Sequence, residues 1–510
     1  MADYTGGDLA ADHLVVLVHG LWGNPNHMAN VAKALRAKHP ADKLYILCAQ
    51  RNSGSFTYDG AELGGERVCS EIQEELQAIE ARGGHITKLS MIGYSHGGLV
   101  ARYAVGLLYA KGILDNVECI NFTAFASPFL GVRSPLRGAT NHIWNVLGAR
   151  TLSMSGRQLF LIDNFRNTGR PLLAILADPN SIFYKGLAKF RRRTLYANII
   201  HDRSTVYYTS AIDKTNPYTD LDKVRLNYVP GYEDLILDPL HPVEHIPPHS
   251  WKKLTFPEAV QKFVGRLPFM LALAVLVPVG VVAYLLNSVV QTVLSSKRIA
   301  LHEKGEAGIN IDDYRPPVLI NGLREAVEDA YEGLNSSQQQ EYLGLSTDDE
   351  EETEEEDEET EEEETDEDSS YGPEHDVSAP LLGSVTEHKH RQQQQHQQPL
   401  PPNFALDDHD GDEDEKAALM AAAATGRRAS EANILRRERK QSMAGQPTLA
   451  LAPCQFEMIQ ALDSLGWRKY RVRIRRNRHS HAAIIVRMDK EAFSEGFVVL
   501  RHWLNEEFIV

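Results

Sequence analysis

One short segment constrains the fold of this chain more than any other. Gly93, Ser95 and Gly97 form a Gly-x-Ser-x-Gly pattern that follows an apolar run and precedes a helix-like stretch. A sharp turn from a strand into a helix brings neighbouring backbones too close for a Cβ atom, which explains the two glycines, and it leaves the serine hydroxyl exposed. The segment therefore predicts a strand over residues 87–92, a tight turn at Ser95 and a helix after the turn.

Short apolar runs alternate with amphipathic stretches from residue 12 to about residue 230. Each run is short enough for a buried strand, so the pattern predicts a parallel sheet covered by helices. Between two runs, Val68, Ile72, Leu76 and Ile79 recur at three- and four-residue spacings, as on one face of a helix. The five predicted strands cover residues 13–19, 43–48, 87–92, 117–125 and 194–200.

The formal net charge of -17 comes mostly from one tract, because residues 348–368 contain 18 Asp or Glu among 21 residues. The rest of the chain has 53 basic and 52 acidic side chains, which is close to neutral. This balance excludes a uniformly acidic solvating protein and a nucleic-acid binder with a basic fold. We therefore expect no nucleic-acid partner.

The cysteines and the first residues bear on the compartment. The four cysteines lie far apart with no Cys-x-x-Cys pair, so neither a disulfide framework nor a thiolate metal site is expected. Residues 1–13 have no basic region followed by an apolar one, so we expect a protein that is not secreted.

A long uncharged segment begins at Leu267 and ends at Ser296, with basic residues on both sides. Its 30 residues exceed the length of about 20 that a helix needs to cross a bilayer core. Three interpretations stay open: a hairpin broken near Pro278 and Gly280, an amphipathic surface segment, or a hydrophobic helix of the core or of a pocket cap.

The remaining chain divides by composition. Residues 335–450 are rich in Glu, Gln and Pro and cannot bury enough apolar surface to become ordered. Their acidic tract is a candidate for binding a protein partner. Short apolar runs return after residue 450, and this tail is predicted to complete the first domain. The predicted parts are a main domain (10–265), a hydrophobic membrane-associating segment (266–296), a linker with short helices (297–334), a disordered insert (335–450) and a C-terminal part of the main domain (451–510).

A second turn lies where hydrolases place a donor to an oxyanion. The run that ends at His19 leads into Gly20, Leu21 and Trp22, and the start of the helix after Ser95 also offers backbone N–H groups. Such groups favour the negative charge that develops on a carbonyl oxygen under attack. We assign the two donors to the backbone N–H groups of Leu21 and His96.

Four motifs together resemble the fungal family of putative serine esterases, which are lipase-like and include a lipid-droplet phospholipase of yeast. The resemblance implies an α/β-hydrolase fold with a Ser-Asp-His triad, no cofactor or metal, and action on acyl esters of lipids. Carried over by motif, Asp202 orients the histidine and His481 is the general base for Ser95. The motifs span residues 19–23, 93–98, 196–208 and 479–487.

Reasoning from the residues alone leaves the Asp and His assignments open. Asp202 follows an apolar run, where α/β folds collect functional loops, but Asp163 and Asp178 compete with it. The chain order Ser, Asp, His agrees with that of hydrolases. Spacing does not separate His481 from its rivals, which are His241, His245, His249, His479 and His502.

The sequence thus predicts a serine hydrolase of the lipase or phospholipase type that cleaves glycerolipid esters at the cytoplasmic face of a membrane or lipid droplet. An acyltransferase or peptidase that uses the same serine is one alternative, and a non-catalytic membrane adaptor on a hydrolase fold is another. A single membrane crossing by residues 267–296 would place Ser95 and His481 on opposite sides, so that topology and this triad are mutually exclusive.

Overall fold

The computed structural model describes the part of the chain that carries the predicted main domain. Its residues all belong to one compact unit, formed by residues 1–343 and 423–510. Most of the predicted disordered insert and residues 247–284 lie outside the described residues. The described ranges are 4–133, 151–246, 285–305, 434, 437, 448–476 and 478–510.

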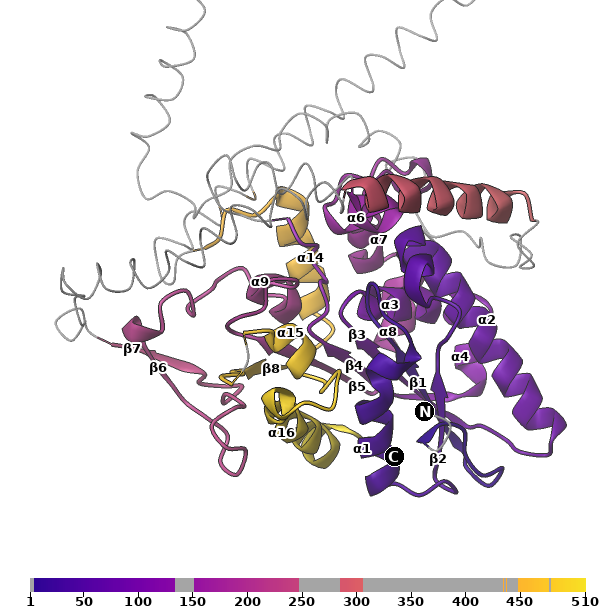
Figure 1. Ribbon diagram of the computed structural model, residues 1–510, viewed down its shortest axis with the longest axis horizontal. Coiled ribbons are helices and arrows are strands. Elements are labelled where there is room, and N and C mark those ends of the chain that lie inside the picture. The colour runs from indigo at the N-terminus through magenta and orange to yellow at the C-terminus, as the bar shows by residue number, and fades with distance from the viewer. Residues whose placement is uncertain are drawn as a thin grey trace, which may run out of the picture. The chain divides into compact units, whose positions relative to one another are not determined.

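Six parallel strands form the central sheet, in the order β2-β1-β3-β4-β5-β8 (Figure 1). The first five follow the apolar runs of the sequence, and their side chains are mostly buried because helices cover both faces of the sheet. The α/β-hydrolase fold predicted from the sequence is confirmed. The strands are β1 (His13–Val18), β2 (Leu44–Cys48), β3 (Lys88–Tyr94), β4 (Glu118–Phe125), β5 (Arg192–Asn198) and β8 (Arg468–Val472).

Alternate side chains of a strand enter two hydrophobic cores, one on each face of the sheet. In β1, Leu14 and Val16 belong to the first core, whereas Val15 and Leu17 belong to the second. The first core is covered by α2 (Gly60–Ala81), α3 (His96–Ala110), α7 (Leu172–Ala177), α8 (Ile182–Ala188) and α14 (Pro453–Asp463). The second core is covered by α1 (Ala29–Lys38) and α16 (Glu495–His502).

The C-terminal residues supply an edge strand of the same sheet. β8 pairs in parallel with β5, with Thr194 opposite Arg468 and Asn198 opposite Val472. Glu507 fixes this edge, because its buried carboxylate accepts hydrogen bonds from the Tyr470 hydroxyl at 2.6 Å and from Thr194 at 3.0 Å. The sheet is therefore built from strands on both sides of the long insertion.

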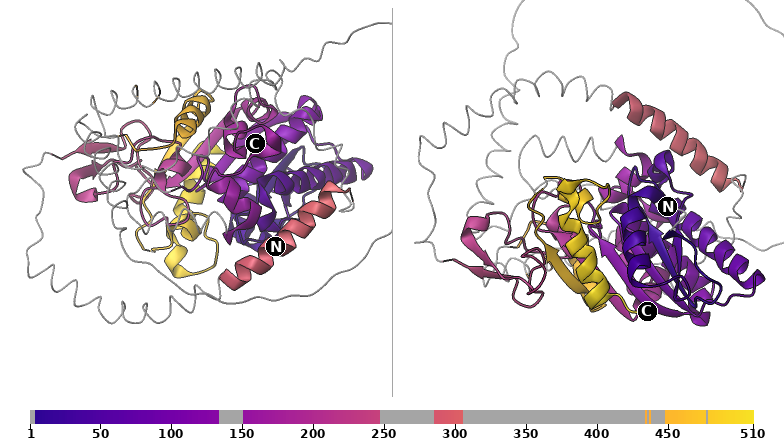
Figure 2. Two further views of the ribbon diagram at one scale, coloured as in Figure 1. Left: turned by 90° about the horizontal axis from the view of Figure 1, so that it is seen from above. Right: turned by 60° about the horizontal axis from the view of Figure 1, so that its bottom comes forward.

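Residues 285–303 form a further helix, which Figure 2 shows along the outside of the domain. This helix runs unbroken across residue 296, where the sequence predicted a boundary between the hydrophobic segment and a linker. Within the described ranges, no helix combines the length and apolar character that a membrane crossing requires.

The remaining elements are short. β6 (Val224–Leu226) and β7 (Val243–His245) pair antiparallel in a separate two-stranded sheet. The short helices are η2 (Pro25–Met28), η3 (Gly54–Asp59), α4 (Ile113–Asn116), α6 (Ser153–Leu159), η4 (Phe165–Asn167), α9 (Tyr207–Ala211), η5 (Leu221–Lys223), α15 (Ser480–Ala483), η8 (Glu491–Phe493) and η9 (Trp503–Glu507).

Candidate active site

Ser95 occupies the sharp turn between β3 and α3 that the sequence predicted. Its backbone has φ 56° and ψ -132°, in a region that residues other than glycine rarely adopt. A Cβ atom on Gly93 would lie 2.4 Å from the Gly98 Cα, and one on Gly97 would lie 2.3 Å from the Val18 carbonyl oxygen. Both elbow glycines are thus required by backbone contacts within the turn.

The turn after β1 lies directly against the serine. A Cβ atom on Gly20 would come within 2.7 Å of the Ser95 Cβ and 3.2 Å of its Oγ, so only glycine allows this approach. The His19 ring contributes to the shape of the turn through a 3.0 Å contact between its Nδ1 and the Gly20 carbonyl oxygen. Leu21 follows Gly20 directly in this turn, and His96, which follows Ser95, is the first residue of α3. Their roles as oxyanion donors stay a prediction.

His481 lies in the short helix α15 and contacts the serine. Its Nε2 lies 2.9 Å from the Ser95 Oγ, and its Nδ1 lies 2.9 Å from the Asp202 Oδ2. These two contacts join the three residues in one hydrogen-bonded chain, although 386 residues separate Ser95 from His481.

Asp202 follows β5 and is held by several donors. The Asn198 side chain donates to its Oδ2 at 2.9 Å, and the backbone N–H groups of Ser204 and Thr205 donate to its Oδ1 at 3.1 and 2.7 Å. Together with His481, these donors fix the carboxylate in place. Ser95, Asp202 and His481 all follow the carboxyl ends of parallel strands, where α/β folds collect their ligand-binding groups.

The competing acidic residues are engaged elsewhere. Asp163 accepts a hydrogen bond from the Leu172 backbone N–H at 2.8 Å, and Asp178 forms an ion pair with Arg170 at 2.5 Å. Neither contact involves Ser95 or His481.

The competing histidines also differ in position from His481. His502 is buried and contacts the Tyr196 hydroxyl through its Nδ1 at 2.8 Å, whereas His241 and His479 are exposed. His249 and the side chain of His245 lie outside the described residues. Of the rivals that can be compared, none takes the place of His481 between Ser95 and Asp202.

Two positioning residues were not identified from the sequence. The Tyr94 hydroxyl donates to the His481 carbonyl oxygen at 2.9 Å, and the Tyr94 ring lies 5.2 Å from the imidazole, between centroids. Asn198 holds Asp202, as described above. A signal existed for Asn198, since it lies within a predicted strand, near its end, and four residues before Asp202. None existed for Tyr94, because its partner is remote in sequence.

Burial controls the charge of the residue next to the nucleophile. Burial lowers the pKa of His96 to about 4, and nearby His19 acts in the same direction, so the ring is neutral at pH 7. Burial also lowers the pKa of His19. Among the described residues, no three His, Cys, Asp or Glu side chains cluster as metal ligands would.

Comparisons with known proteins agree with the resemblance that the sequence motifs indicated. Residues 9–213 match the family model described as a putative serine esterase (DUF676). The putative lipase YDL109C of Saccharomyces cerevisiae is 30% identical over 246 residues, which cover 47% of this chain and 36% of that protein. The putative lipase ROG1 of the same yeast is 30% identical over 225 residues, which cover 42% of this chain and 31% of that protein.

The matched region spans only about a third of the length of these two relatives. Among solved structures, the phospholipase PlaB from Legionella pneumophila in complex with thio-NAD superposes with a TM-score of 0.24 and 12% identity, covering 39% of this chain and 41% of that one. A superposition this weak carries no argument. The fold assignment rests instead on the sheet order and on the turn at Ser95.

Proposed function

Because residues 9–213 match the putative serine esterases, we propose that this chain is a serine hydrolase that cleaves acyl esters of glycerolipids. One observation carries the proposal: the hydrogen-bonded chain from Ser95 through His481 to Asp202, placed at a strained strand-to-helix turn. A turn with a purely structural role would require neither the strained backbone at Ser95 nor a hydrogen bond from a histidine 386 residues further along the chain.

The geometry suits acyl transfer through a covalent intermediate. The His481 Nε2 accepts the Ser95 proton as Oγ attacks the ester carbonyl, and the Asp202 carboxylate stabilises the imidazolium that forms. The backbone N–H groups of Leu21 and His96 are the proposed donors to the oxyanion. His481 then protonates the leaving alcohol, and a water molecule, activated by the same histidine, releases the fatty acid and restores Ser95.

The substrate and the location are also proposals. The names of the relatives as lipases and the exposed Trp22 in the turn that packs against Ser95 both favour lipid esters, with phospholipids as the first class to test. We place the enzyme at the cytoplasmic face of a membrane or lipid droplet, and we propose a basic protein partner for the acidic tract of residues 348–368.

The first test is labelling of the full chain with a fluorophosphonate probe, which reacts with an activated serine. Wild type should label, Ser95→Ala should not, and His481→Ala and Asp202→Asn should label about 10⁴-fold more slowly, since triad members act as a unit. His479→Ala is a matched control, because this exposed histidine lies two residues from His481. Circular dichroism and thermal unfolding check that every variant remains folded.

The outcomes separate the alternatives. A wild type that does not label, or a folded His481→Ala variant that labels at the wild-type rate, contradicts the proposal. A catalytically inert membrane adaptor would give the first result. Release of fatty acid from phospholipid, compared with transfer to an added alcohol or cleavage of peptides, distinguishes a hydrolase from an acyltransferase or a peptidase.

A further inference from the structure

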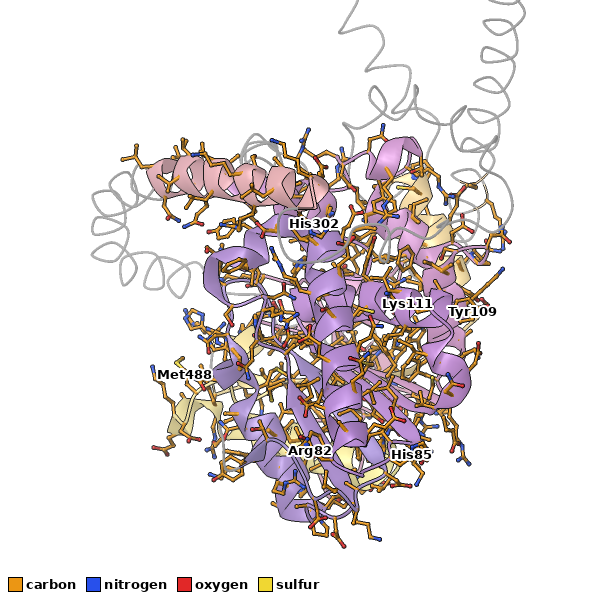
Figure 3. All side chains as sticks on the ribbon, turned by 90° about the vertical axis from the view of Figure 1, so that its right-hand side faces the viewer. Arg82, His85, Tyr109, Lys111, His302 and Met488 are labelled. Atoms are coloured by element: carbon orange, nitrogen blue, oxygen red, sulfur yellow. The ribbon has the colours of Figure 1, made fainter. Side chains whose placement is uncertain are left out.

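The helix over residues 285–303 packs against the domain with its polar side. Ser288, Ser295 and His302, which we call the polar stripe, recur every seven residues and are all buried. The Ser288 hydroxyl donates to the Thr151 carbonyl oxygen at 2.7 Å, and His302 contacts the buried Glu66 carboxylate. Figure 3 shows His302 near the C-terminal end of this helix, and this end lies beside α2.

An arginine strengthens this attachment. The Arg298 Nε lies 3.0 and 2.9 Å from the two carboxylate oxygens of Asp59, and an Nη atom donates to the Ser55 carbonyl oxygen at 2.8 Å. The Asp59 side chain is completely buried and also pairs with Arg67 at 2.7 Å. Such a paired, forked contact fixes orientation as well as position. The helix is therefore held with one defined face toward the domain.

The opposite face of the helix is apolar and exposed. A surface helix of a globular protein normally buries its apolar side, so this orientation is inverted. Leu286 is 65% exposed and Val289 is 63% exposed. The large aliphatic side chains that are more than 40% exposed, which we call the aliphatic stripe, are Leu286, Val289, Val290, Val293, Leu294 and Leu301. An exposed apolar helix face of this kind marks an interaction site.

The chemistry of the stripe favours a lipid surface over a protein partner. The stripe contains only Leu and Val, which are under-represented among the residues that dominate protein interfaces. Lys297 is exposed on the helix and Lys304 is exposed directly after its last residue, so their amino groups can reach phosphate headgroups while their stems stay beside the aliphatic stripe. Helices that lie in the membrane plane combine an apolar face with basic residues in this way.

Exposed aromatic side chains connect the helix with the nucleophile. Phe56 in η3 is 41% exposed, and the guanidinium of Arg298 stacks on its ring at 5.0 Å. Thr57, the next residue, accepts a hydrogen bond from the Trp22 backbone N–H at 3.0 Å. Trp22 is itself 53% exposed and belongs to the turn that packs against Ser95. Trp is enriched at membrane–water interfaces.

We infer that the aliphatic stripe, with Phe56 and Trp22, is the surface by which this protein binds a lipid layer, with the helix of residues 285–303 lying in the layer plane. The polar stripe and the Arg298–Asp59 pair hold the helix against η3 and α2, and Thr57 of η3 contacts the turn after β1 that packs against Ser95. Binding therefore brings the side of the domain that carries the nucleophile to the lipid. The inference rests on the proposed function for the identity of the lipid as substrate, but the binding itself is measured separately.

The experiment measures vesicle binding and catalysis of the same full-length variants. Val290→Glu combined with Val293→Glu places two charges on the aliphatic stripe, and Leu240→Glu combined with Met488→Glu places two charges at exposed apolar positions elsewhere. Cosedimentation uses phosphatidylcholine vesicles with and without phosphatidylserine, and a soluble short-chain ester reports the triad. Light scattering gives the oligomeric state.

We expect the stripe variant to bind vesicles at least tenfold more weakly than wild type and to hydrolyse the soluble ester at the wild-type rate, whereas the control binds normally. Phosphatidylserine should strengthen wild-type binding. The inference is overturned if wild type does not bind vesicles, if both variants bind equally well, or if the stripe variant only changes from dimer to monomer or loses thermal stability with binding unchanged. Normal vesicle binding without ester hydrolysis would contradict the proposed function and leave the lipid-binding surface standing.

Discussion

Ser95 keeps its unusual backbone conformation because hydrogen bonds and close contacts with surrounding residues constrain it. Such a conformation costs about 1–3 kcal/mol and persists only where the fold determines it strongly. The Ser95 N–H donates to the Phe125 carbonyl oxygen at 2.9 Å, and the Gly98 N–H donates to the Ser95 carbonyl oxygen at 3.0 Å. These bonds and the glycine contacts hold the hydroxyl toward His481.

The variant Tyr94→Phe tests how far the position of His481 depends on its hydrogen bond with Tyr94. The change removes the hydroxyl that donates to the His481 carbonyl oxygen and keeps the ring. A lost hydrogen bond of about 0.5–1.5 kcal/mol should lower kcat about twofold to thirteenfold with little change in KM. Steady-state kinetics on a soluble ester measure both constants.

Tyr45→Phe is the matched control. Tyr45 lies on β2, an edge strand of the sheet, and the change removes a hydroxyl that contacts the Glu75 carboxylate at 2.6 Å. Equal losses of kcat in the two variants would show that the effect is a general loss of structure. An unchanged kcat in Tyr94→Phe would show that α15 holds His481 without this contact.

Among the elements, α7 has a buried carboxyl group, that of Asp163, at its N-terminus. The Asp163 carboxyl accepts a hydrogen bond from the N–H of Leu172, the first residue of α7, and its other oxygen has no hydrogen-bond partner among the described residues. The carboxyl group is buried although other atoms of the residue are partly exposed. Burial raises the pKa of Asp163 from 3.8 to about 7.

Asp163→Asn should therefore stabilise the protein in a pH-dependent way. Between pH 4 and 7 the folded state holds a proton that the unfolded state has released, so the free energy of unfolding of wild type falls as the pH rises through this range. The neutral amide keeps an acceptor for Leu172 and does not titrate. Thermal unfolding should give a higher Tm for Asp163→Asn than for wild type at pH 8.5, and a smaller difference at pH 5.

Asp178→Asn, at the other end of α7, should instead lower the Tm at pH 8.5, because it removes the ion pair with Arg170. A difference between Asp163→Asn and wild type that is the same at pH 5 and pH 8.5 would mean that Asp163 does not titrate in this range.

The elements also show what local sequence can predict. The five predicted strands and the apolar face of α2 agree with the structure, since a buried strand or amphipathic helix is encoded by neighbouring residues. The helix of residues 285–303 was different, because its uncharged half left a membrane hairpin, an amphipathic surface segment and a buried helix equally open. Its orientation depends on Asp59 and Glu66, which are more than 200 residues away and carry no local signal.

For the molecule as a whole, the sheet is completed by a strand from beyond the insertion. The position of Ser95 was predictable from its own neighbours, because the turn is encoded within five residues. The place of His481 between Ser95 and Asp202 was not predictable from spacing, since several histidines were equivalent, and only the resemblance to the esterase family selected it. The pairing of β8 with β5, which is a contact across more than 270 residues, and the hydrogen bond from Tyr94 bring the histidine to the site.

The compact unit of residues 1–343 and 423–510 contains all described residues and the triad. Replacing residues 344–422 by a flexible Gly/Ser linker of about 20 residues should therefore leave the Tm and the hydrolysis of a soluble ester unchanged. Fluorophosphonate labelling and thermal unfolding measure both properties.

Deletion of residues 451–510 is the control, and it should abolish labelling, because it removes β8 and His481. Loss of labelling in the linker variant, with its fold intact, would show that residues 344–422 contribute to the site.

The late position of β8 also has a consequence for when the proposed activity would arise during biosynthesis. A ribosome makes Ser95, Asp202 and five of the six strands long before it reaches His481, and domains generally form as the chain emerges. The nascent chain therefore has a nucleophile without its base, and a chain cut short by damaged message has the same defect. An enzyme that attacks lipid esters would thus stay inert beside cellular membranes until its synthesis has passed His481.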